Sequence, residues 1–290
     1  MAESSTSNRK VLVLMADYGN DPTEVAIPVS VFKESGLTVH FATEKGVSPR
    51  CDKRMLEGIT GMLLGANAKA KKAYQDIISA QDSSQGSIAH PYSWTSPSFL
   101  MDDYDLVFLP GGHDKGVRQL IDSDIIHQHL TSYFPKTSRD GDKDKDSKVV
   151  AAICHGVQVL GFTPDSSSPT PRFPLSDQNN IQRSSFKSII HKCTTTALPG
   201  FMESAIFQAT RLFLGDYYKT YGNCTPNVED YVKAGLDDPS QFQAGPSLWS
   251  GKSGTPFVVV DKNFRYLSGR YPPDAEMLAT KAVEMLREGN

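Results

Sequence analysis

Short apolar runs alternate with segments of helical periodicity in the first part of the chain. Residues 11–15 form a continuous apolar run after a polar start, which is typical of a parallel strand buried on both faces. From about Thr23 the apolar residues recur every three or four positions, the spacing of an amphipathic helix. Residues 37–43 have the pattern of a second strand. The chain therefore opens as strand, helix, strand, the unit of a parallel sheet covered by helices.

The same alternation continues to the C-terminal part of the chain. It predicts strands at 106–109, 148–153 and 256–260, and helices at 117–134, 156–162, 204–218 and 275–287. Composition does not shift sharply enough anywhere to mark a domain boundary. We therefore expect one α/β domain over residues 1–290, with insertions near 45–100 and 163–250.

Net charge, hydropathy and cysteine content argue against several classes of protein. The 290 residues carry a net charge of −3, which gives no long-range attraction to nucleic acid or to an anionic membrane. No run approaches the roughly 20 apolar residues of a membrane span, and the first ten residues lack the apolar core of a secretory signal. The four cysteines are far apart, with no C-x-x-C pair. We expect a cytoplasmic protein with reduced thiols, not a zinc ribbon or a thioredoxin-type redox site.

Cys154 has the clearest chemical context of the four cysteines. It directly follows the apolar strand at 148–153 and is itself followed by His155, Gly156 and a predicted helix. A nucleophile on such a sharp turn projects from the carboxyl edge of the sheet, where ligands bind in open α/β sheets. The positive end of the helix would lower the pKa of the thiol, so we expect Cys154 to be the most reactive cysteine. The alternative is a buried structural cysteine with His155 as a polar neighbour.

A second strand end carries complementary groups. Gly111, Gly112 and His113 follow the strand predicted at 106–109. The backbone N–H groups of a glycine pair can point at the oxyanion of an acyl-type or enediolate intermediate. We therefore assign Gly111, Gly112 and His113 to oxyanion or substrate binding. A Pro-Gly-Gly turn alone is common, so the assignment depends on the presence of Cys154 at another strand end.

Four short segments together resemble the ThiJ/PfpI superfamily, which is related to class I glutamine amidotransferases. They are Asp-Pro-Thr-Glu at 21–24, Leu-Pro-Gly-Gly-His-Asp at 109–114, Ala-Ala-Ile-Cys-His-Gly at 151–156 and Leu-Ser-Gly-Arg-Tyr-Pro at 267–272. The resemblance extends from residue 10 to about residue 290, and it implies a flavodoxin-like three-layer sandwich with a mostly parallel central sheet. The extra length resembles the larger glyoxalase III/chaperone branch. Residues 198–203 and 215–218 resemble a fungal-type subgroup.

The resemblance also implies roles for four side chains. Cys154 would be the nucleophile. Glu24 would lie against its sulfur, protonated or sharing a proton with it, because a neighbouring thiolate raises the pKa of a carboxyl. His155 would be the general acid/base, and Glu203 would be the acid that orients it. Without the resemblance, Glu24 is an ordinary first-turn glutamate favoured by the helix dipole, and Glu203 is a surface carboxylate at a helix start.

Other histidines and aromatic residues give weaker indications. His90 and Trp94 lie in a segment that resembles a substrate-side stretch of related proteins, although a plain aromatic loop is the alternative. His127 and His129 are two positions apart, so on a helix they point to different faces, which is a poor arrangement for a metal site. We expect neither an obligatory metal nor a cofactor.

The leading hypothesis is a cofactor-independent enzyme for small reactive carbonyls, with a glyoxalase III-like conversion of methylglyoxal to a 2-hydroxy acid. A non-turnover stress-response, redox-sensing or chaperone protein is the alternative, because oxidants attack an accessible thiol of low pKa first. An isocyanide-type hydratase is a second alternative. A glutaminase subunit is disfavoured, since such enzymes use a C-terminal His-x-Glu and no histidine follows His191. The expected partners are a small-molecule substrate and, in a homodimer, a second copy of the chain.

Overall fold

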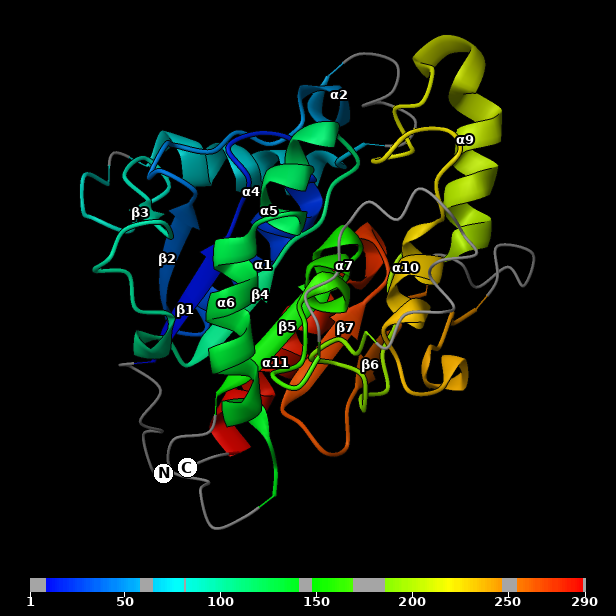
Figure 1. Ribbon diagram of the computed structural model, residues 1–290. Coiled ribbons are helices and arrows are strands. Elements are labelled where there is room, and N and C mark those ends of the chain that lie inside the picture. Colours follow the sequence, from blue (N-terminus) through cyan, green and yellow to red (C-terminus); the bar gives the residue numbers. More distant parts are fainter. Residues whose placement is uncertain are drawn as a thin grey trace.

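The computed structural model describes residues 9–57, 65–80, 82–140, 148–168, 186–246 and 255–288. In these ranges the centre of the molecule is a seven-stranded sheet with the order β3-β2-β1-β4-β5-β7-β6 (Figure 1). The strands are β1 (Lys10–Leu14), β2 (Thr38–Thr43), β3 (Tyr92–Ser93), β4 (Leu106–Leu109), β5 (Val149–Ile153), β6 (Val258–Val260) and β7 (Tyr266–Gly269). Neighbouring strands are parallel except for β6 and β7. The predicted α/β fold with a mostly parallel sheet is therefore confirmed.

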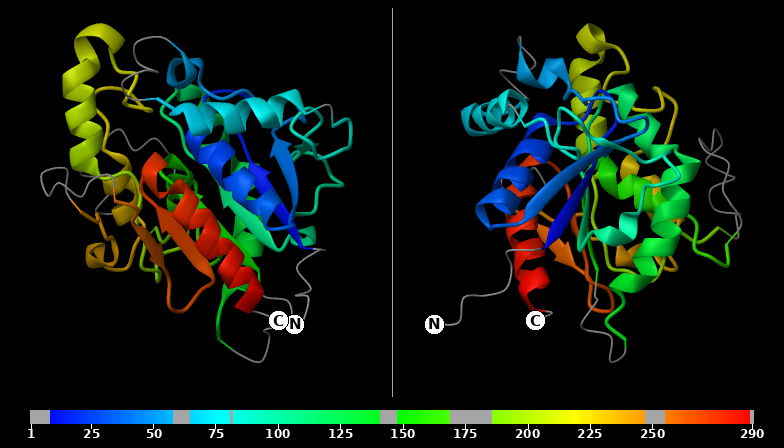
Figure 2. Two further views of the ribbon diagram at one scale, coloured as in Figure 1. Left: turned by 180° about the vertical axis from the view of Figure 1, so that it is seen from behind. Right: turned by 90° about the vertical axis from the view of Figure 1, so that its left-hand side faces the viewer.

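Helices cover both faces of the sheet and complete the three layers (Figure 2). On one face α1 (Pro22–Glu34) packs against α4 (Ala68–Ser79) and α11 (Ala275–Glu288). On the other face lie α5 (Arg118–Ile121), α6 (Asp124–Tyr133) and α7 (His155–Phe162), and α10 (Val228–Ala234) packs on α7. The helices α2 (Lys53–Leu56) and α9 (Gly200–Leu214) lie towards the carboxyl ends of the strands (Figure 1). Short 3-10 turns occur at Met101–Asp103, Lys115–Val117, Phe134–Thr137, Pro239–Gln241 and Pro272–Asp274.

The central strands are apolar on both faces because helices cover both. Every residue of β4 and β5 is buried, as are four of the five residues of β1. Removal of this apolar surface from water is the main force that holds such a sheet between its helices. The helix α7 is also buried along its whole length, since it lies between the sheet and α10. The strand and the helix that flank Cys154 are thus both enclosed.

Two helices differ from the predicted ranges. The helix expected over 117–134 is divided into α5 and α6, because Ser123 starts a new helix by accepting a hydrogen bond from the N–H of Ile126 at 3.3 Å. The helix expected over 204–218 is α9, which begins at Gly200 and ends where Gly215 adopts a φ of 60°.

Some elements have no clear sequence pattern. The sequence does not predict α4, α10, β3 or β7. Of these, β3 has two residues, and β7 contains Ser268 and Gly269 among its four, so neither forms an apolar run. Residues 58–64, 81, 169–185 and 247–254, most of which belong to the two expected insertions, lie outside the described part of the chain. The charged segment 141–147 also lies outside it.

The strand order brings three chain segments to one edge of the sheet. The chain runs outward from β1 to β2 and β3, and then returns to β4 and β5 on the other side of β1. Open α/β sheets bind ligands at the carboxyl ends of the strands where the order reverses in this way. The segments that follow β1, β4 and β5 carry Glu24, Gly111 and Cys154.

Candidate active site

Cys154 occupies a strained turn between β5 and α7. Its backbone has φ 57° and ψ −124°, and it is the only non-glycine residue with a positive φ in the described ranges. Its N–H donates to the carbonyl of Gly269 at 3.1 Å, and its carbonyl accepts from the N–H of Val157 at 3.2 Å. Such a conformation costs about 1–3 kcal/mol and persists where the surrounding structure enforces it. The strand-to-helix turn predicted from the sequence is thus present.

Two glycines let the ends of β4 and β5 approach each other at this turn. A Cβ on Gly156 would lie 2.0 Å from the carbonyl oxygen of Leu109. A Cβ on Gly111 would lie 2.7 Å from the nitrogen of His155 and 2.8 Å from the Cβ of Cys154. Side-chain carbons do not come this close to other atoms, so both positions require glycine.

Glu24 reaches the same point from the first turn of α1. Asp21 caps this helix and accepts hydrogen bonds from the N–H groups of Thr23 at 2.7 Å and Glu24 at 3.1 Å. The buried Glu24 carboxyl accepts from the N–H of Gly111 at 3.0 Å, and the Cys154 thiol is one of the groups that act on its pKa. Burial, and after it the charge of Asp21, raises the pKa of Glu24 well above its usual value. Glu24 Oε2 and the Cβ of Cys154 both lie beside Gly111, so the predicted contact with the sulfur stays a prediction, and the raised pKa of Glu24 favours its protonated form.

The N–H of Gly111 is engaged by the Glu24 carboxyl. While this N–H donates to Glu24, it is not free to bind a substrate oxyanion. The structure therefore does not show the oxyanion-binding role that the sequence predicts for Gly111. The same turn is held by Asn20, whose side-chain amide donates to the Gly111 carbonyl at 3.2 Å. Gly112 packs against the backbone of Gly19 and Asn20. Oxyanion binding by Gly112 stays a prediction.

The Cys154 thiol is enclosed, with only 1% of the residue exposed. Burial is the largest influence on its pKa and the Glu24 carboxyl is the next, and both raise it well above the usual value. The N–H of His155 acts in the opposite direction. The helix N-terminus thus acts in the expected direction, but the expected low pKa of the thiol is wrong, because burial outweighs the helix. At neutral pH the residue rests as a thiol and needs a base before it can attack.

His155 supplies a base at hydrogen-bonding distance. Its Nδ1 lies 3.4 Å from Cys154 Sγ, and its Nε2 lies 2.9 Å from the Oγ1 of Thr220. The Thr220 hydroxyl donates its single proton to the carbonyl of His113 at 3.4 Å, so its oxygen accepts from Nε2–H. This assigns the tautomer in which an unprotonated Nδ1 faces the sulfur. Burial is the main cause that lowers the pKa of His155 well below its usual value, so the ring is neutral and able to take a proton.

Glu203 does not orient His155 directly. This buried side chain of α9 accepts a hydrogen bond from the N–H of Val228 at 2.9 Å and forms an ion pair with Lys219 at 3.2 Å. Among the described residues, the hydrogen-bond partner of the His155 Nε2 is Thr220. Thr220 thus makes the contact with the ring that we expected from Glu203. Sequence reasoning missed Thr220 because it lies 65 residues after His155 and belongs to no motif.

His113 packs beside His155 from the loop after β4. Its ring centroid lies 5.1 Å from that of His155 and 4.8 Å from that of Tyr218. Burial lowers the pKa of His113 to about 4, so the ring is neutral at physiological pH. In the described part of the chain, neither its Nδ1 nor the buried Tyr218 hydroxyl has a hydrogen-bond partner. These groups suit a polar atom of a substrate, and the sequence does not predict Tyr218 as a site residue.

The segment with His90 and Trp94 lies apart from these residues. It surrounds β3, which is the edge strand beyond β1 and β2. His90 is exposed and Trp94 is fully buried in the core, so the structure does not bring the expected substrate-side residues to the site. The ring of His127 contacts the carbonyl of Ile121, and that of His129 contacts the carbonyl of Trp94.

The described residues contain neither a cluster of metal ligands nor a helix that could span a membrane. In these ranges, no three or more His, Cys, Asp or Glu side chains are grouped so as to hold a metal ion. No helix in the same ranges is long and apolar enough to cross a membrane.

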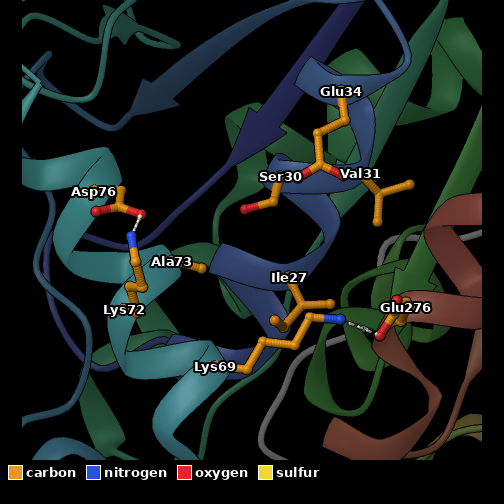
Figure 3. Close-up of a pocket in the computed structure, with 9 residues that line it drawn as sticks. All are labelled: Ile27, Ser30, Val31, Glu34, Lys69, Lys72, Ala73, Asp76 and Glu276. Carbon is orange, nitrogen blue, oxygen red and sulfur yellow. Dashed lines mark hydrogen bonds and ion pairs between the residues drawn. The ribbon is translucent and has the colours of Figure 1, made fainter.

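A surface groove lies between α1, α4 and α11 (Figure 3). Two ion pairs cross or flank it, Lys69 with Glu276 at 2.7 Å and Lys72 with Asp76 at 2.6 Å. All four side chains are exposed, and such pairs contribute about 0–1 kcal/mol. No cysteine or histidine lines this groove, so we place no chemistry there.

Comparison with known proteins agrees with this geometry. A model of ThiJ/PfpI family-like proteins matches residues 15–246, and the chain therefore belongs to this family. An uncharacterized protein of Schizosaccharomyces pombe is 26% identical over 277 residues, which cover 96% of this chain and 83% of that protein.

Solved structures share the fold at low sequence identity. Glyoxalase III from Candida albicans has a TM-score of 0.59 at 17% identity, and the match covers 96% of this chain and 97% of that one. Rapid Encystment Protein 24 KDa from Francisella tularensis has a TM-score of 0.54 at 15% identity, with 96% and 99% covered. These likenesses establish the flavodoxin-like three-layer architecture of the chain.

Proposed function

We propose that this protein is a cysteine-dependent enzyme that acts on small reactive carbonyls without a cofactor and converts methylglyoxal or a related dicarbonyl to a 2-hydroxy acid. One observation carries the proposal: Nδ1 of His155 lies 3.4 Å from Sγ of Cys154, and its Nε2 is held by Thr220. Covalent catalysis requires a nucleophile, a base within reach and a group that orients the base. The glyoxalase III of Candida albicans, which shares the fold, supports this choice of reaction.

In the proposed reaction, His155 transfers a proton at each step that precedes hydrolysis. As Cys154 Sγ bonds to the aldehyde carbon, its proton passes to Nδ1 of His155, and the carbonyl π pair becomes an alkoxide. The ring returns the proton to the alkoxide, which gives a hemithioacetal. The neutral ring then moves the aldehyde-derived proton to the neighbouring carbon through an enediol, which leaves a thioester. Water hydrolyses the thioester to the 2-hydroxy acid and restores the thiol, so the net reaction consumes only water.

The charges near the sulfur favour a neutral electrophile. Two carboxyl groups act on the pKa of Cys154: Glu24, whose own raised pKa favours the uncharged form, and Asp21. Burial raises the pKa of Asp21 to about 6, so above that pH this residue is a buried negative charge. A 2-oxo acid anion such as glyoxylate would be repelled, whereas a neutral dicarbonyl would not.

Two other functions use the same thiol. A redox sensor needs an accessible thiol of low pKa, and the burial and raised pKa of Cys154 disfavour that function. An isocyanide-type hydratase would use the same nucleophile and base, so it stays an alternative. A homodimer stays part of the proposal.

A substrate panel tests the proposed function. The reduced protein carries Cys224→Ser, because Cys224 is exposed and would itself add to aldehydes, and Cys154→Ala in the same background is the blank. Methylglyoxal, glyoxylate, an isocyanide and a glycated amino acid are compared by product analysis. We expect a 2-hydroxy acid from methylglyoxal, slower reaction of glyoxylate, and no product with Cys154→Ala. Turnover of the isocyanide alone would replace the proposal with a hydratase, and no turnover with ready oxidation of Cys154 would replace it with a sensor.

A further inference from the structure

A small polar cavity lies where α7 meets the segment after α9. Its walls include His155 and Gln158 of α7, Glu203 of α9, and Thr220. His155 and Gln158 are three positions apart, so they share one face of α7. The space open to the centre of a water molecule is about 10 Å³, which is roughly what a single water needs.

Gln158 lines this cavity but has no role in the proposed reaction. Only 1% of it is exposed, and within the described residues neither the oxygen nor the nitrogen of its carboxamide has a hydrogen-bond partner. Buried carboxamides are almost always bonded to protein or to ordered water. Because the group offers donors and an acceptor together, the ligand that satisfies it must also accept and donate.

Glu203 and Thr220, which also line the cavity, can form further hydrogen bonds. The Glu203 carboxylate uses one oxygen for the N–H of Val228 and the other for Lys219, and a carboxylate has about four acceptor positions. The Thr220 hydroxyl has a long hydrogen bond of 3.4 Å to the carbonyl of His113, so a closer acceptor would compete for its proton.

We propose that this cavity binds one ordered water molecule, held by Gln158 and Glu203, which connects the Thr220 hydroxyl and through it His155 to the Glu203 carboxylate. The chain of hydrogen bonds runs from Nε2–H to Thr220 Oγ1, from that hydroxyl to the water, and from the water to the carboxylate. Glu203 is thereby a positioning residue that acts on His155 at a distance. When Nδ1 takes the thiol proton, the ring becomes positive, and the relay couples this charge to the Glu203 carboxylate. Besides burial, His113 and Lys219, the ion-pair partner of Glu203, act in the opposite direction and lower the pKa of His155.

The role of His155 in this relay rests on the proposed function, whereas the water site does not. A crystal structure of the full chain, at a resolution that resolves ordered water, tests the site directly. We expect water density within hydrogen-bonding distance of Gln158 and Glu203, and its loss in Gln158→Leu, which cannot hydrogen-bond. A wild-type cavity without such density overturns the proposal.

The coupling is tested by the rate of Cys154 alkylation as a function of pH, in the Cys224→Ser background. Loss of the relay makes the positive ring less stable, so Gln158→Leu and Thr220→Val should move the midpoint of the rate to higher pH. Thr220→Ser should restore the wild-type midpoint. Gln128→Leu, at an exposed glutamine of α6, is the matched control and should not move it.

The rate of methylglyoxal turnover is a second measurement on the same variants. We expect kcat for methylglyoxal to fall roughly two- to tenfold in Gln158→Leu, the size of one hydrogen bond, with KM unchanged. If that variant does not fold, Gln158→Met takes its place. A wild-type pH midpoint in the folded Gln158 variant would refute the relay. A displaced midpoint in a protein that leaves methylglyoxal untouched would keep the relay and reject the proposed substrate, because alkylation requires no turnover.

Discussion

Burial sets the protonation state of each reactive side chain at the site. It raises the pKa of Glu24 and of the Cys154 thiol, and it lowers the pKa of His155. Each shift favours the uncharged form, because surroundings of low dielectric constant penalise charge. The resting site therefore holds a neutral thiol, a neutral imidazole and a protonated carboxyl. In the proposed reaction, charges separate only when the sulfur meets an electrophile.

The order in which the cysteines react follows from this state. Brief treatment with iodoacetamide at neutral pH should modify Cys224 first, because it is exposed. Cys154 should react slowly, and its rate should rise at alkaline pH, because it is buried with a raised pKa. Mass mapping of the labelled peptides measures both. Preferential labelling of Cys154 at neutral pH would contradict the account and restore the low pKa expected from the sequence.

Asp21 gives a prediction about stability and pH. Burial raises its pKa from 3.8 to about 6, so between these values the native state holds a proton that the unfolded chain has released. Stability therefore falls as pH rises through this window. Asparagine keeps the N-cap acceptor without the charge. Asp21→Asn should be close to the wild type at about pH 4 and more stable by up to about 3 kcal/mol above about pH 7.

Urea unfolding at the two pH values measures this difference. Asp103→Asn, at an exposed aspartate, is the control and should change stability little at either pH. An Asp21→Asn effect of the same size at both pH values would show that the buried charge is not its cause.

Local motifs predict three of the site residues but not their surroundings. Cys154 and His155 are adjacent in the sequence, and Glu24 lies in the first turn of a recognisable helix, so a strand–turn–helix pattern is enough to find them. Thr220 is brought to His155 by the fold alone. The Glu203 carboxylate, which counting along the chain assigns to His155, instead contacts Val228 and Lys219. The pKa of Cys154 depends on burial by the whole fold, which is why the local pattern predicts its direction wrongly.

At the scale of elements, the turn between β5 and α7 stores backbone strain. Cys154→Gly and Cys154→Ala both remove the sulfur, but only glycine adopts a φ of 57° without strain. Cys154→Gly should therefore be more stable than Cys154→Ala by about 1–3 kcal/mol. In the ordinary strand conformation of β5, Ala151→Gly should lose stability instead. Thermal unfolding of the variants measures both, and a less stable Cys154→Gly would mean that the turn is unstrained.

The contact between β4 and α7 gives a second prediction at this scale. Gly156→Ala would place a Cβ 2.0 Å from the Leu109 carbonyl oxygen, which forces the backbone apart and should cost about 1–3 kcal/mol or more. Gly161→Ala in the same helix meets only ordinary contacts at 3.4 Å and should be neutral or stabilising, because alanine favours helix. Similar unfolding midpoints for the two variants would argue against the close approach of these elements.

The sequence predicts those strands whose own residues form a continuous apolar run, which indicates burial on both faces. The strands β1, β4 and β5 are buried on both faces, and each is a continuous apolar run. By contrast, β3 and β7 are ordered by pairing with strands that lie distant in the sequence. The break between α5 and α6 depends on the capping hydrogen bond of Ser123, which periodicity does not detect.

At the scale of the whole molecule, the reversal of strand order assembles the site. Three segments that lie far apart in the sequence meet at the carboxyl ends of β1, β4 and β5, and the loop after α9 adds Thr220. The family is shown by the match of its model to the sequence, and the fold by the strand order and the likeness to solved structures. The substrate depends on finer detail, namely the proton positions and charges around Cys154, so it requires measurement.

The central claim is that His155 moves the proton between Cys154 and the substrate. The most direct measurement is kcat for methylglyoxal in His155→Ala, with alkylation of Cys154 at alkaline pH in the same preparation to show that the thiol is still available. A positioned acid/base contributes about 10²- to 10⁴-fold. We predict a fall of this size with Cys154 still modifiable, and an unchanged kcat in His155→Ala would contradict the account.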